Sequence, residues 1–312
     1  MEIRIGYLGT PHTLLEVVHT MTLKKYKMLG NLASLELDKI IIENLKTLDK
    51  IIDYNIKNNI EFYRMTHNLL PLASIKDIDY NYFKHKDICF KIGQKIKKHN
   101  IRIDSHPDHY LVLSTKDSEV LENSIRMLSM HKNLFDMLDI NGKVIIHIGS
   151  KFPSKEEALD RFQNNFLNLD KELQEIILLE NDDTNYTVTE TLFLCEKLNI
   201  PMVLDYHHFK CLHDKNEKID KLLPRIIKTW RNSNLNPKMH FSSPKSLKEK
   251  RTHHFYIDYH SFIKFVNLIK NLDTNIDIML ESKGKDESLF KLLRQLKFYK
   301  VFKFKKNKII FD

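Results

Sequence analysis

Short apolar segments of this chain end repeatedly in side chains that bind metal ions. One apolar run ends in His106, and the next carries His147. Later runs lead into Glu180, Asp205 and Glu281. Imidazole and carboxylate groups without a thiolate cluster suit Mn²⁺, Fe²⁺ or Zn²⁺. Because the same residue types recur at one point of a repeating unit, we expect them to converge on a single site.

Further histidines extend this set. His207 and His208 follow Asp205 closely, His240 lies on a later apolar run, and His253 lies in the loop after it. The whole set exceeds what one tetrahedral ion can use, so we expect more than one ion. Closely spaced ions stabilise the attacking and leaving oxygens in phosphodiester hydrolysis. A sugar isomerase also uses a carboxylate-rich two-metal site, but the many histidines and the basic composition favour a phosphodiesterase.

These residues belong to a regular alternation of apolar runs and amphipathic segments. The expected strands are Ile3–Leu8, Glu61–Met65, Arg102–His106, Lys143–Ile148, Ile176–Leu179, Met202–Asp205, Met239–Ser242 and Ile276–Glu281. The expected helices are Leu37–Asn58, Lys84–Lys98, Ser118–Leu138, Lys155–Leu169, Val188–Leu198, Asp220–Arg231, Tyr259–Leu272 and Glu287–Leu296. Eight of each predict an α/β protein with a single (β/α)₈ TIM barrel, whose active site lies at the C-terminal ends of the strands. We expect residues 1–298 to form this domain and residues 299–312 to form a C-terminal extension with a short strand or hairpin.

Composition limits the class of protein. Of the 312 residues, 42% are hydrophobic and 29% are charged, as in a globular protein with a sizeable core. No apolar run approaches the roughly 18–20 residues that cross a bilayer, and no signal peptide is visible, so we expect no membrane association. The thiols Cys89, Cys195 and Cys211 are far apart in sequence and are expected to be free in a reducing cytoplasm. The net charge of +9 favours a polyanionic partner, although a lysine-rich surface can also be merely solvated.

The same strand ends carry a family resemblance, from Ile3 to about Leu292. The carriers are Tyr63-Arg64-Met65, Pro71-Leu72-Ala73-Ser74, His106-Pro107-Asp108-His109-Tyr110, Ile146-His147-Ile148-Gly149, Leu179-Glu180-Asn181-Asp182-Asp183, Asp205-Tyr206-His207-His208-Phe209, Lys228-Thr229-Trp230, Pro237-Lys238-Met239-His240-Phe241-Ser242-Ser243-Pro244-Lys245 and Asp277-Ile278-Met279-Leu280-Glu281-Ser282-Lys283. Together and in this order they resemble the UV damage endonuclease family, a relative of the endonuclease IV and xylose isomerase barrels. Any one of these motifs alone would be weak.

The resemblance implies a DNA repair enzyme. It would nick damaged double-stranded DNA on the 5′ side of cyclobutane dimers, (6-4) photoproducts and some other lesions, including abasic sites, and leave a 3′-hydroxyl and a 5′-phosphate. It would hold a cluster of divalent ions, with manganese preferred and zinc or iron as alternatives, and would use no nucleotide cofactor. The ligands carried over by position are His106, His147, Glu180, Asp205, His208, His240, His253 and Glu281.

Roles follow for other residues. Glu180, Glu281 and Lys238 would be catalytic, with the two carboxylates bridging or anchoring the ions. Lys238 matches a family lysine that can be carboxylated, and an unmodified lysine there would instead be a cation beside phosphate; both possibilities stay open. The expected lesion-probing residues are Tyr7, His109 and Tyr110, although rim packing is the alternative for the tyrosines. The expected phosphate contacts are Lys155, Lys245, Arg251, Lys283 and Lys285.

The chain departs from the family pattern in several places. Near the first strand, an asparagine often found close behind the tyrosine is absent, and Tyr7 is followed by Leu8-Gly9-Thr10-Pro11. The family usually shows a histidine where this chain has Ile75, and His67 stands where the family usually has serine. The probing pair after His106-Pro107 is His109-Tyr110, which differs from the common family pairs. These departures keep three alternatives open: an abasic-site endonuclease of the endonuclease IV type, a sugar isomerase, and a DNA-binding protein whose site has decayed.

Overall fold

The protein folds as a closed parallel barrel. The structure is a computed structural model that describes residues 1–78, 80–107 and 110–311. Eight parallel strands pair in the order β2-β3-β4-β5-β6-β7-β8-β1, and β1 also pairs with β2, which closes the sheet. The strands are β1 Glu2–Leu8, β2 Phe62–Met65, β3 Arg102–Ser105, β4 Lys143–His147, β5 Ile177–Glu180, β6 Met202–Asp205, β7 Lys238–Phe241 and β8 Ile276–Leu280. The prediction of a (β/α)₈ TIM barrel is confirmed.

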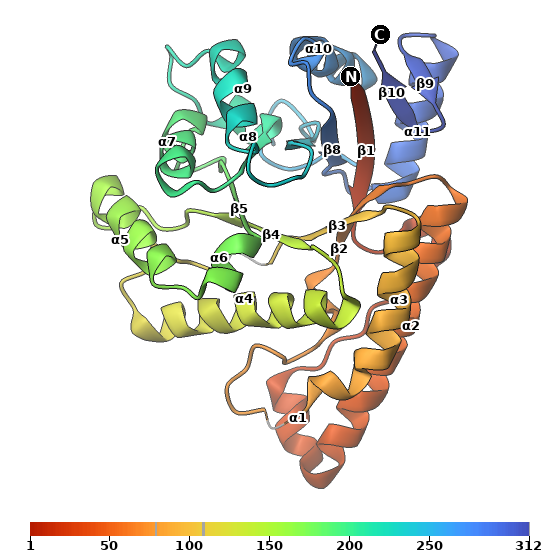
Figure 1. Ribbon diagram of the computed structural model, residues 1–312, viewed down its shortest axis with the longest axis vertical. Coiled ribbons are helices and arrows are strands. Elements are labelled where there is room, and N and C mark those ends of the chain that lie inside the picture. The colour runs from red at the N-terminus through yellow and green to blue at the C-terminus, as the bar shows by residue number, and fades with distance from the viewer. Residues whose placement is uncertain (79, 108–109, 312) are drawn as a thin grey trace.

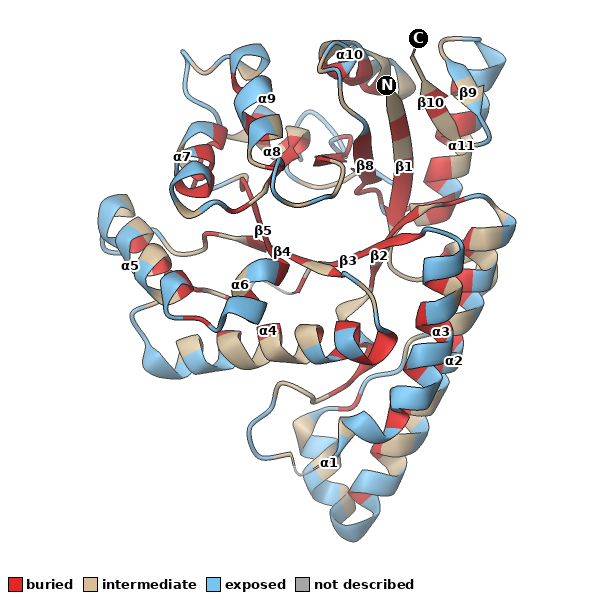
Figure 2. Ribbon diagram, in the orientation of Figure 1, coloured by how far each residue is buried: buried red, intermediate tan, exposed pale blue. Residues whose placement is uncertain are grey.

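Helices surround the barrel in chain order, from α2 and α3 on one side through α4 to α7, α9 and α11 (Figure 1). The α-helices are α1 Leu23–Leu29, α2 Ala33–Lys57, α3 Lys86–Lys98, α4 Ser118–Leu138, α5 Lys155–Leu167, α6 Lys171–Ile176, α7 Val188–Leu198, α8 Tyr206–Cys211, α9 Ile219–Lys228, α10 Tyr259–Ile269 and α11 Lys285–Phe298. Short 3₁₀ turns cover His12–Leu14, Gly30–Leu32, His67–Leu69 and Tyr82–His85. Figure 2 shows that the barrel strands are largely buried and that the long helices around them bury one face each.

Helix starts follow local capping chemistry. The side chain of Asp117 accepts hydrogen bonds from the backbone N–H groups of the first turn of α4, and Thr187 with Glu190 forms a capping box at the start of α7. These two helices have the bounds that their apolar periodicity predicts. The short helices α1, α6 and α8 were not predicted, because six or seven residues give too little periodicity to recognise.

Alternate residues of each strand pack into two different layers. Ile3 and Ile5 of β1 belong to the large apolar cluster between the strands and the helices. Ile145, Leu178 and Val203, from three neighbouring strands, form a separate small cluster with Trp230 inside the barrel. Because side chains alternate along a strand, residues two positions from these interior residues also point inward. This periodicity brings the last inward residue of each strand to one end of the barrel.

Charged groups fill the lower part of the barrel interior. Arg4 donates two hydrogen bonds of 2.6 Å to the carboxylate of Asp277, and Arg102 donates one of 2.9 Å to the same group. One layer higher, Lys238 lies 3.1 Å from Asp104. Paired and hydrogen-bonded charges of this kind are tolerated in the interior, whereas breaking one pair leaves an uncompensated buried charge.

The end of the chain forms a hairpin of β9 Lys303–Lys305 and β10 Lys308–Ile310. Strand β10 pairs antiparallel with β1 outside the barrel, so the two termini lie close together (Figure 1). Lys308 fastens this hairpin by ion pairs to Glu2 and Glu61. Within the described residues, no helix is long and apolar enough to cross a membrane.

Candidate metal centre and active site

The C-terminal end of the barrel gathers the residues that the sequence singled out. His147 and Glu180 are register partners on β4 and β5, and Asp205 and His240 are register partners on β6 and β7. Glu281 follows β8 directly. Each of these side chains continues the inward-facing positions of its strand. These strand-end residues therefore converge at one end of the barrel, as the sequence predicts.

Two groups of potential ligand atoms share one carboxylate. His106, His147 and Glu180 form the first group, and Glu180, Asp205, His240 and Glu281 form the second; within each group the ligand atoms lie within 4.8 Å of one another. Oε2 of Glu180 lies 3.0 Å from Nε2 of His106 and 3.7 Å from Nε2 of His147. Its other oxygen, Oε1, lies 2.7 Å from Nδ1 of His240. Glu180 thus faces both groups, one oxygen to each.

Three of the histidines are oriented through their second ring nitrogen. Nδ1 of His106 lies 3.1 Å from the carbonyl of Pro107, and Nδ1 of His208 lies 2.9 Å from the carbonyl of Asn181. Nδ1 of His147 lies 3.3 Å from the carbonyl of Glu180. Donation of Nδ1–H to a backbone carbonyl leaves Nε2 as a lone-pair donor, which is the arrangement typical of metal-ligating histidines.

Asp205 shows the local chemistry that builds the site. It is the N-cap of α8, and its Oδ1 accepts a 2.7 Å hydrogen bond from the backbone N–H of His208. This cap starts the helix directly after β6 and so places His208 over the barrel mouth. Oδ2 of Asp205 is fully buried, has no hydrogen-bond partner among the described residues, and lies 3.8 Å from Nδ1 of His208 and 3.9 Å from Nδ1 of His240. A buried, unpaired carboxylate oxygen among histidines needs a cation.

Glu281 and His253 complete the far side. Nδ1 of His253 lies 3.9 Å from Oε2 of Glu281, and its loop is held by a β-bridge to Pro244. Oε1 of Glu281 forms an ion pair with Arg64 and lies 3.1 Å from Nδ1 of His240. His207, by contrast, is buried with its ring edge-on to His253 and its Nε2 3.9 Å from the sulfur of Cys211. Like His208 and His253, which were expected to be ligands, His207 belongs to neither of the two ligand groups.

The surroundings of the two buried carboxylates shift their pKa values in opposite directions. Burial and then the charge of Glu281 raise the pKa of Glu180 well above its ordinary value. Burial would also raise the pKa of Glu281, but Arg64 and then His240 hold it well below the ordinary value. Burial lowers the pKa of His208, but the negative charges of Asp205 and Glu180 outweigh burial and raise this pKa to about 10. A cation bound beside Glu180 would compensate the negative charges of the neighbouring carboxylates and favour the ionised form of Glu180.

Lys238 lies deeper in the barrel than the candidate ligands at the strand ends. Its side chain is completely buried, its Nζ is 3.1 Å from Oδ2 of Asp104, and it packs 5.1 Å from the centre of the Phe62 ring. Burial, opposed by Asp104, lowers the pKa of the amine to about 8. The lysine is therefore an ion-paired group of the barrel interior, two residues below His240.

This donor set fits divalent ions. The unpaired oxygen of Asp205, the shared carboxylate of Glu180 and the oriented histidines supply nitrogen and oxygen ligands in two adjoining groups. The buried cluster of His, Asp and Glu side chains could hold metal ions.

Comparison with known proteins assigns the family. Residues 3–312 match the family model described as UV-endonuclease UvdE. The chain belongs to this family. A UV DNA damage endonuclease from Bacillus cereus (strain B4264) is 36% identical over 305 residues, which are 95% of each chain. The crystal structure of SacUVDE superimposes with a TM-score of 0.86 at 32% identity, over 96% of this chain and 99% of that one. Endonuclease IV from Thermus thermophilus, at 13% identity and a TM-score of 0.56, covers 96% of this chain and 99% of its own and shares the fold.

Membership of the UvdE family makes the chain an endonuclease that acts on DNA. The sugar isomerase considered from the sequence is thereby not supported. The residues expected to contact DNA should then lie around the candidate metal ligands.

One of the expected probing residues lies in the wrong place. Tyr7 is completely buried, its hydroxyl donates a 2.8 Å hydrogen bond to Asn55, and its ring lies 5.3 Å from that of Tyr63. It shares the outward face of β1 with Ile3 and Ile5, so it packs against α2. The prediction that Tyr7 wedges into DNA is wrong, because a fully buried ring cannot enter a base stack.

Tyr110 is placed differently. It is 79% exposed and follows the strand end that carries His106. His109, which precedes it, lies outside the described residues. Tyr110 borders the segment that lines a cavity of about 540 Å³ beside the candidate ligands His106 and His147, and the wall of this cavity includes Pro107, Leu111 and Val112.

The expected phosphate-contacting cations differ in their surroundings. Arg251 lines the central cavity, whose wall also includes His106 and His253, and Lys283 lines an adjoining cavity. Lys155 is paired with Glu190 at 2.7 Å, Lys245 with Glu249 at 2.8 Å, and Lys285 donates to the carbonyl of Thr10 at 2.9 Å. These three amines already have protein partners.

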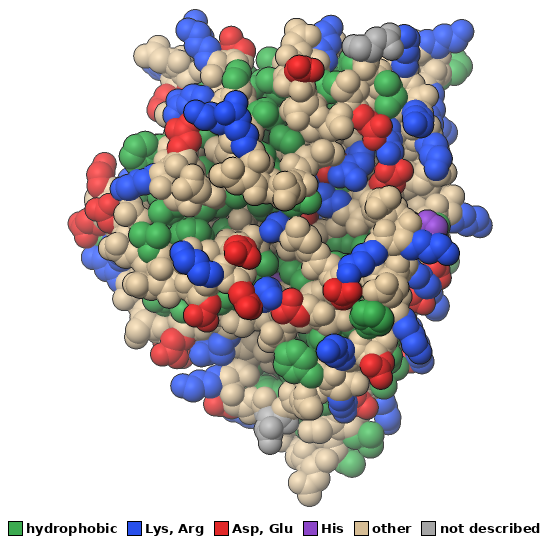
Figure 3. Space-filling view, in the orientation of Figure 1, with side chains coloured by type: hydrophobic (Ala, Val, Ile, Leu, Met, Phe, Trp, Pro, Cys, Tyr) green, Lys and Arg blue, Asp and Glu red, His purple; other side chains and the backbone are tan. Residues whose placement is uncertain are grey.

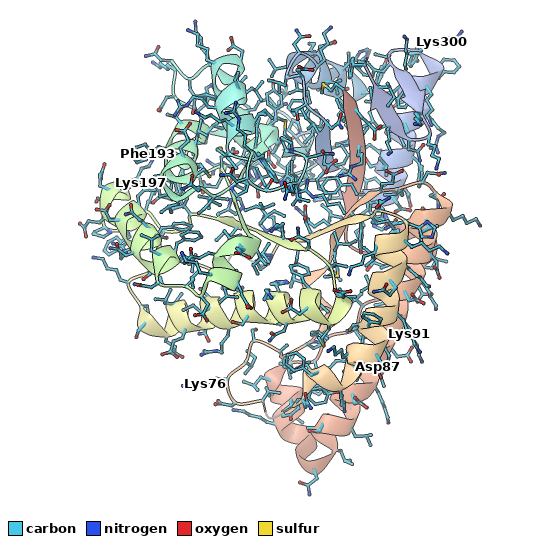
Figure 4. The ribbon with its side chains drawn as sticks, viewed as in Figure 1. Lys76, Asp87, Lys91, Phe193, Lys197 and Lys300 are labelled. Carbon is cyan, nitrogen blue, oxygen red and sulfur yellow. The ribbon has the colours of Figure 1, made fainter. Side chains whose placement is uncertain are left out.

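The basic excess is not confined to one area. On the face shown in Figure 3, Lys and Arg side chains are interspersed with Asp and Glu side chains. Figure 4 shows Lys91 on α3 and Lys197 on α7 at the periphery, far from the barrel axis. Basic side chains therefore also lie on the helical shell, away from the strand ends.

Sequence reasoning missed two residues of the site. Arg64, on β2, pairs with Glu281, and Asn181 joins two strand ends through hydrogen bonds of 2.9 and 3.0 Å with the backbone of Asp205. The sequence could have indicated Arg64 through its position on the strand. Arg64 stands on β2 at the inward position nearest the strand end, the position that the candidate ligands occupy on other strands. His67, noted only as a departure, lines the central cavity together with His106 and His253, whereas Ile75 is absent from that lining.

Proposed function

We propose that the protein is a metal-dependent DNA repair endonuclease that nicks the phosphodiester backbone 5′ to UV photoproducts, and also at abasic sites. The ions would be divalent, with Mn²⁺ preferred, and the substrate damaged double-stranded DNA, with no nucleotide cofactor. Because its substrate is chromosomal DNA, we expect the enzyme to work in the cytoplasm. Residues 1–298 would supply the whole catalytic domain, with residues 299–312 as an extension.

The observation that supports this most is the shared carboxylate of Glu180. A carboxylate that faces two adjoining ligand groups, one oxygen to each, suits a bridge between two ions. Paired divalent ions polarise a phosphodiester, activate water and neutralise the departing oxygen. His106 and His147 would hold one ion and Asp205, His240 and Glu281 the next, with His208 and His253 as ligands at the margins.

The protein's own groups would prepare the site for this reaction. The buried carboxylates of Glu180 and Glu281, which come from β5 and from the end of β8, would help to hold the cations. Hydrogen bonds from the histidine Nδ1 atoms to backbone carbonyls keep the ligand rings from turning. Lys238, paired with Asp104, supports the ring from below, and its partly neutral amine at physiological pH would be open to carboxylation.

Lesion recognition would involve the rim beside His106. Nucleotides extruded from a weakened stack would enter the cavity of about 540 Å³, whose apolar wall of Pro107, Leu111 and Val112 suits bases. Tyr110, together with His109, would fill the gap left in the duplex. Phosphate groups along the backbone would be contacted by Arg251 and Lys283, and by Lys155, Lys245 and Lys285 where DNA displaces their protein partners.

The decisive experiment is nicking of defined duplexes. Oligonucleotides that carry a cyclobutane dimer, a (6-4) photoproduct, an abasic site or no damage are incubated with the protein, with Mn²⁺ or with EDTA. We expect Mn²⁺-dependent nicks 5′ to the photoproducts with 3′-hydroxyl and 5′-phosphate ends. Nicking at abasic sites alone would instead support an enzyme of the endonuclease IV type. Absence of nicking with Mn²⁺, Zn²⁺ or Fe²⁺ would refute the proposal and leave a DNA-binding protein.

A further inference from the structure

Arg64 is a cation built into the ring of acidic and imidazole groups. On β2 its neighbours Tyr63 and Met65 belong to the apolar cluster under the helices, so Arg64 points into the barrel. Its register partners are Leu8 on β1 and Asp104 on β3. Only 13% of its side chain is exposed. The end of β2 supplies none of the candidate metal ligands. Its inward, largely buried side chain is instead Arg64, which raises the question of what this arginine does.

One part of the guanidinium holds Glu281. Nη1 of Arg64 contacts Oε1, which also lies 3.1 Å from Nδ1 of His240. The other oxygen, Oε2, faces His253 at 3.9 Å. A carboxylate has two oxygens, and Arg64 occupies one of them. Oε1 is therefore shared between Arg64 and His240, while Oε2, which Arg64 does not contact, faces His253.

The rest of the guanidinium faces open space. Arg64 lines a cavity of about 500 Å³ and an adjoining one of about 410 Å³. The wall of the first includes His67, His106, His147, His208, His253 and Glu281. A guanidinium has five N–H donors in a planar fork, and the contact with Glu281 uses one nitrogen. Donors therefore remain for a group in the cavity.

Arg64 is also the better placed of the two arginines that line this cavity. Arg251 is 61% exposed and lies 3.6 Å from Asp183. Arg64 is largely but not fully buried, so its charge acts at short range in a medium of lower dielectric constant than water. A buried guanidinium beside metal ligands matches the geometry of a phosphate oxygen better than a mobile ammonium group does.

We propose that Arg64 binds a non-bridging oxygen of the scissile phosphate with the open edge of its guanidinium while Nη1 holds Glu281 in its ligand orientation. This rests on the proposed function, since it assigns a substrate contact within that site. Arg64 is then a substrate-binding residue of the catalytic centre, and its charge compensates the phosphate in addition to the ions.

The test separates phosphate binding from metal binding and from nicking. Affinity for inorganic phosphate is measured calorimetrically on Mn²⁺-loaded protein, bound manganese by elemental analysis, and nicking at saturating Mn²⁺. Arg64→Gln is expected to weaken phosphate binding at least about tenfold, since charge-assisted hydrogen bonds are strong, and to lower kcat about 10²-fold. Arg64→Lys keeps the charge without the fork and is expected to recover phosphate binding only in part.

Controls make each outcome decisive. Arg225→Gln removes an exposed arginine paired with Glu196 on the outer helices, and it should change none of the three measurements. If saturating Mn²⁺ restores phosphate affinity and kcat to Arg64→Gln, Arg64 serves only to hold Glu281 and the proposal is overturned. If Arg64→Gln does not fold, Arg64→Lys decides alone, and wild-type phosphate affinity in it contradicts the role of the fork. Arg64-dependent phosphate binding without any nicking would refute the proposed function but not this inference.

Discussion

Oε1 of Glu180 lies 2.7 Å from Nδ1 of His240, while Oε2 of the same carboxylate lies 3.0 Å from Nε2 of His106. The three residues come from β5, from β7 and from the end of β3, so the contact spans the barrel mouth. Burial and the charge of Glu281 raise the pKa of Glu180, which means that its anionic form is unfavourable without added cations. Metal binding and ionisation of this residue should therefore be coupled.

Glu180→Gln should remove manganese from both ligand groups. The amide keeps the shape of the side chain but has one oxygen and no charge, so it cannot bridge two ions. We expect bound Mn²⁺ to fall to less than about half of the wild-type content and nicking to fall at least about 10³-fold, whereas binding to undamaged duplex persists because phosphate contacts dominate it. Elemental analysis, a nicking assay and fluorescence anisotropy measure the three quantities.

Glu196→Gln is the matched control for that substitution. Glu196 lies on the exposed outer face of α7, where it pairs with Arg225. Its replacement should leave metal content and nicking unchanged. Full metal content in Glu180→Gln would show that Glu180 does not bridge ions.

His67→Ala tests whether this chain supplies a replacement for the family histidine missing at Ile75. His67 lines the central cavity with His106 and His253, and Ile75 does not. We expect the Mn²⁺ concentration for half-maximal nicking to rise about 10- to 100-fold, the range seen when groups that support a metal site are lost. Titration of nicking with Mn²⁺ measures the change. An unchanged midpoint would mean that His67 only lines the cavity.

Tyr110→Ala should reduce lesion discrimination. The ring is 79% exposed beside the strand end of His106 and free to enter a weakened base stack. Base–aromatic contacts contribute roughly 1–3 kcal/mol, so affinity for photoproduct duplexes should fall about 5- to 200-fold, with little change for undamaged duplex.

Phe298→Ala is its control, since Phe298 is similarly exposed but ends α11 at the opposite end of the barrel. Equal losses of affinity for damaged and undamaged duplexes in Tyr110→Ala would show that the ring is a general contact.

His131→Phe should change the pH dependence of stability. His131 is buried in α4, and neither ring nitrogen has a hydrogen-bond partner among the described residues. Burial, with a contribution from His67, lowers its pKa to about 3, so the folded protein keeps it neutral while the unfolded chain protonates near the ordinary pKa of 6.5. The unfolded state thus binds more protons between these values, and stability is lost as pH falls through this window.

The variant lacks this proton uptake. Between pH 7 and pH 4, metal-free wild type should lose about 3 kcal/mol more free energy of unfolding than His131→Phe. Urea unfolding at the two pH values measures both losses. Equal losses would show that His131 is protonated in the folded protein.

The sequence by itself determined the barrel and most of the site. Apolar runs and helical periodicity identify eight strand–helix units, and parallel strands in a closed barrel must bring their C-terminal ends together. Residues such as His147, Asp205 and Glu281 could therefore be grouped without coordinates, because each immediately ends or follows a strand.

Only the tertiary structure decided which face of each strand is the interior and what lies opposite each side chain. Tyr7 and Arg64 both lie near strand ends, yet the barrel register turns Tyr7 toward α2 and Arg64 toward Glu281. The sharing of Glu180 between two ligand groups likewise depends on β3, β5 and β7 meeting across the barrel mouth. The contacts of Glu180 with His240 and His106 join residues 60 and 74 positions apart, so they follow from closure of the sheet and not from any local pattern.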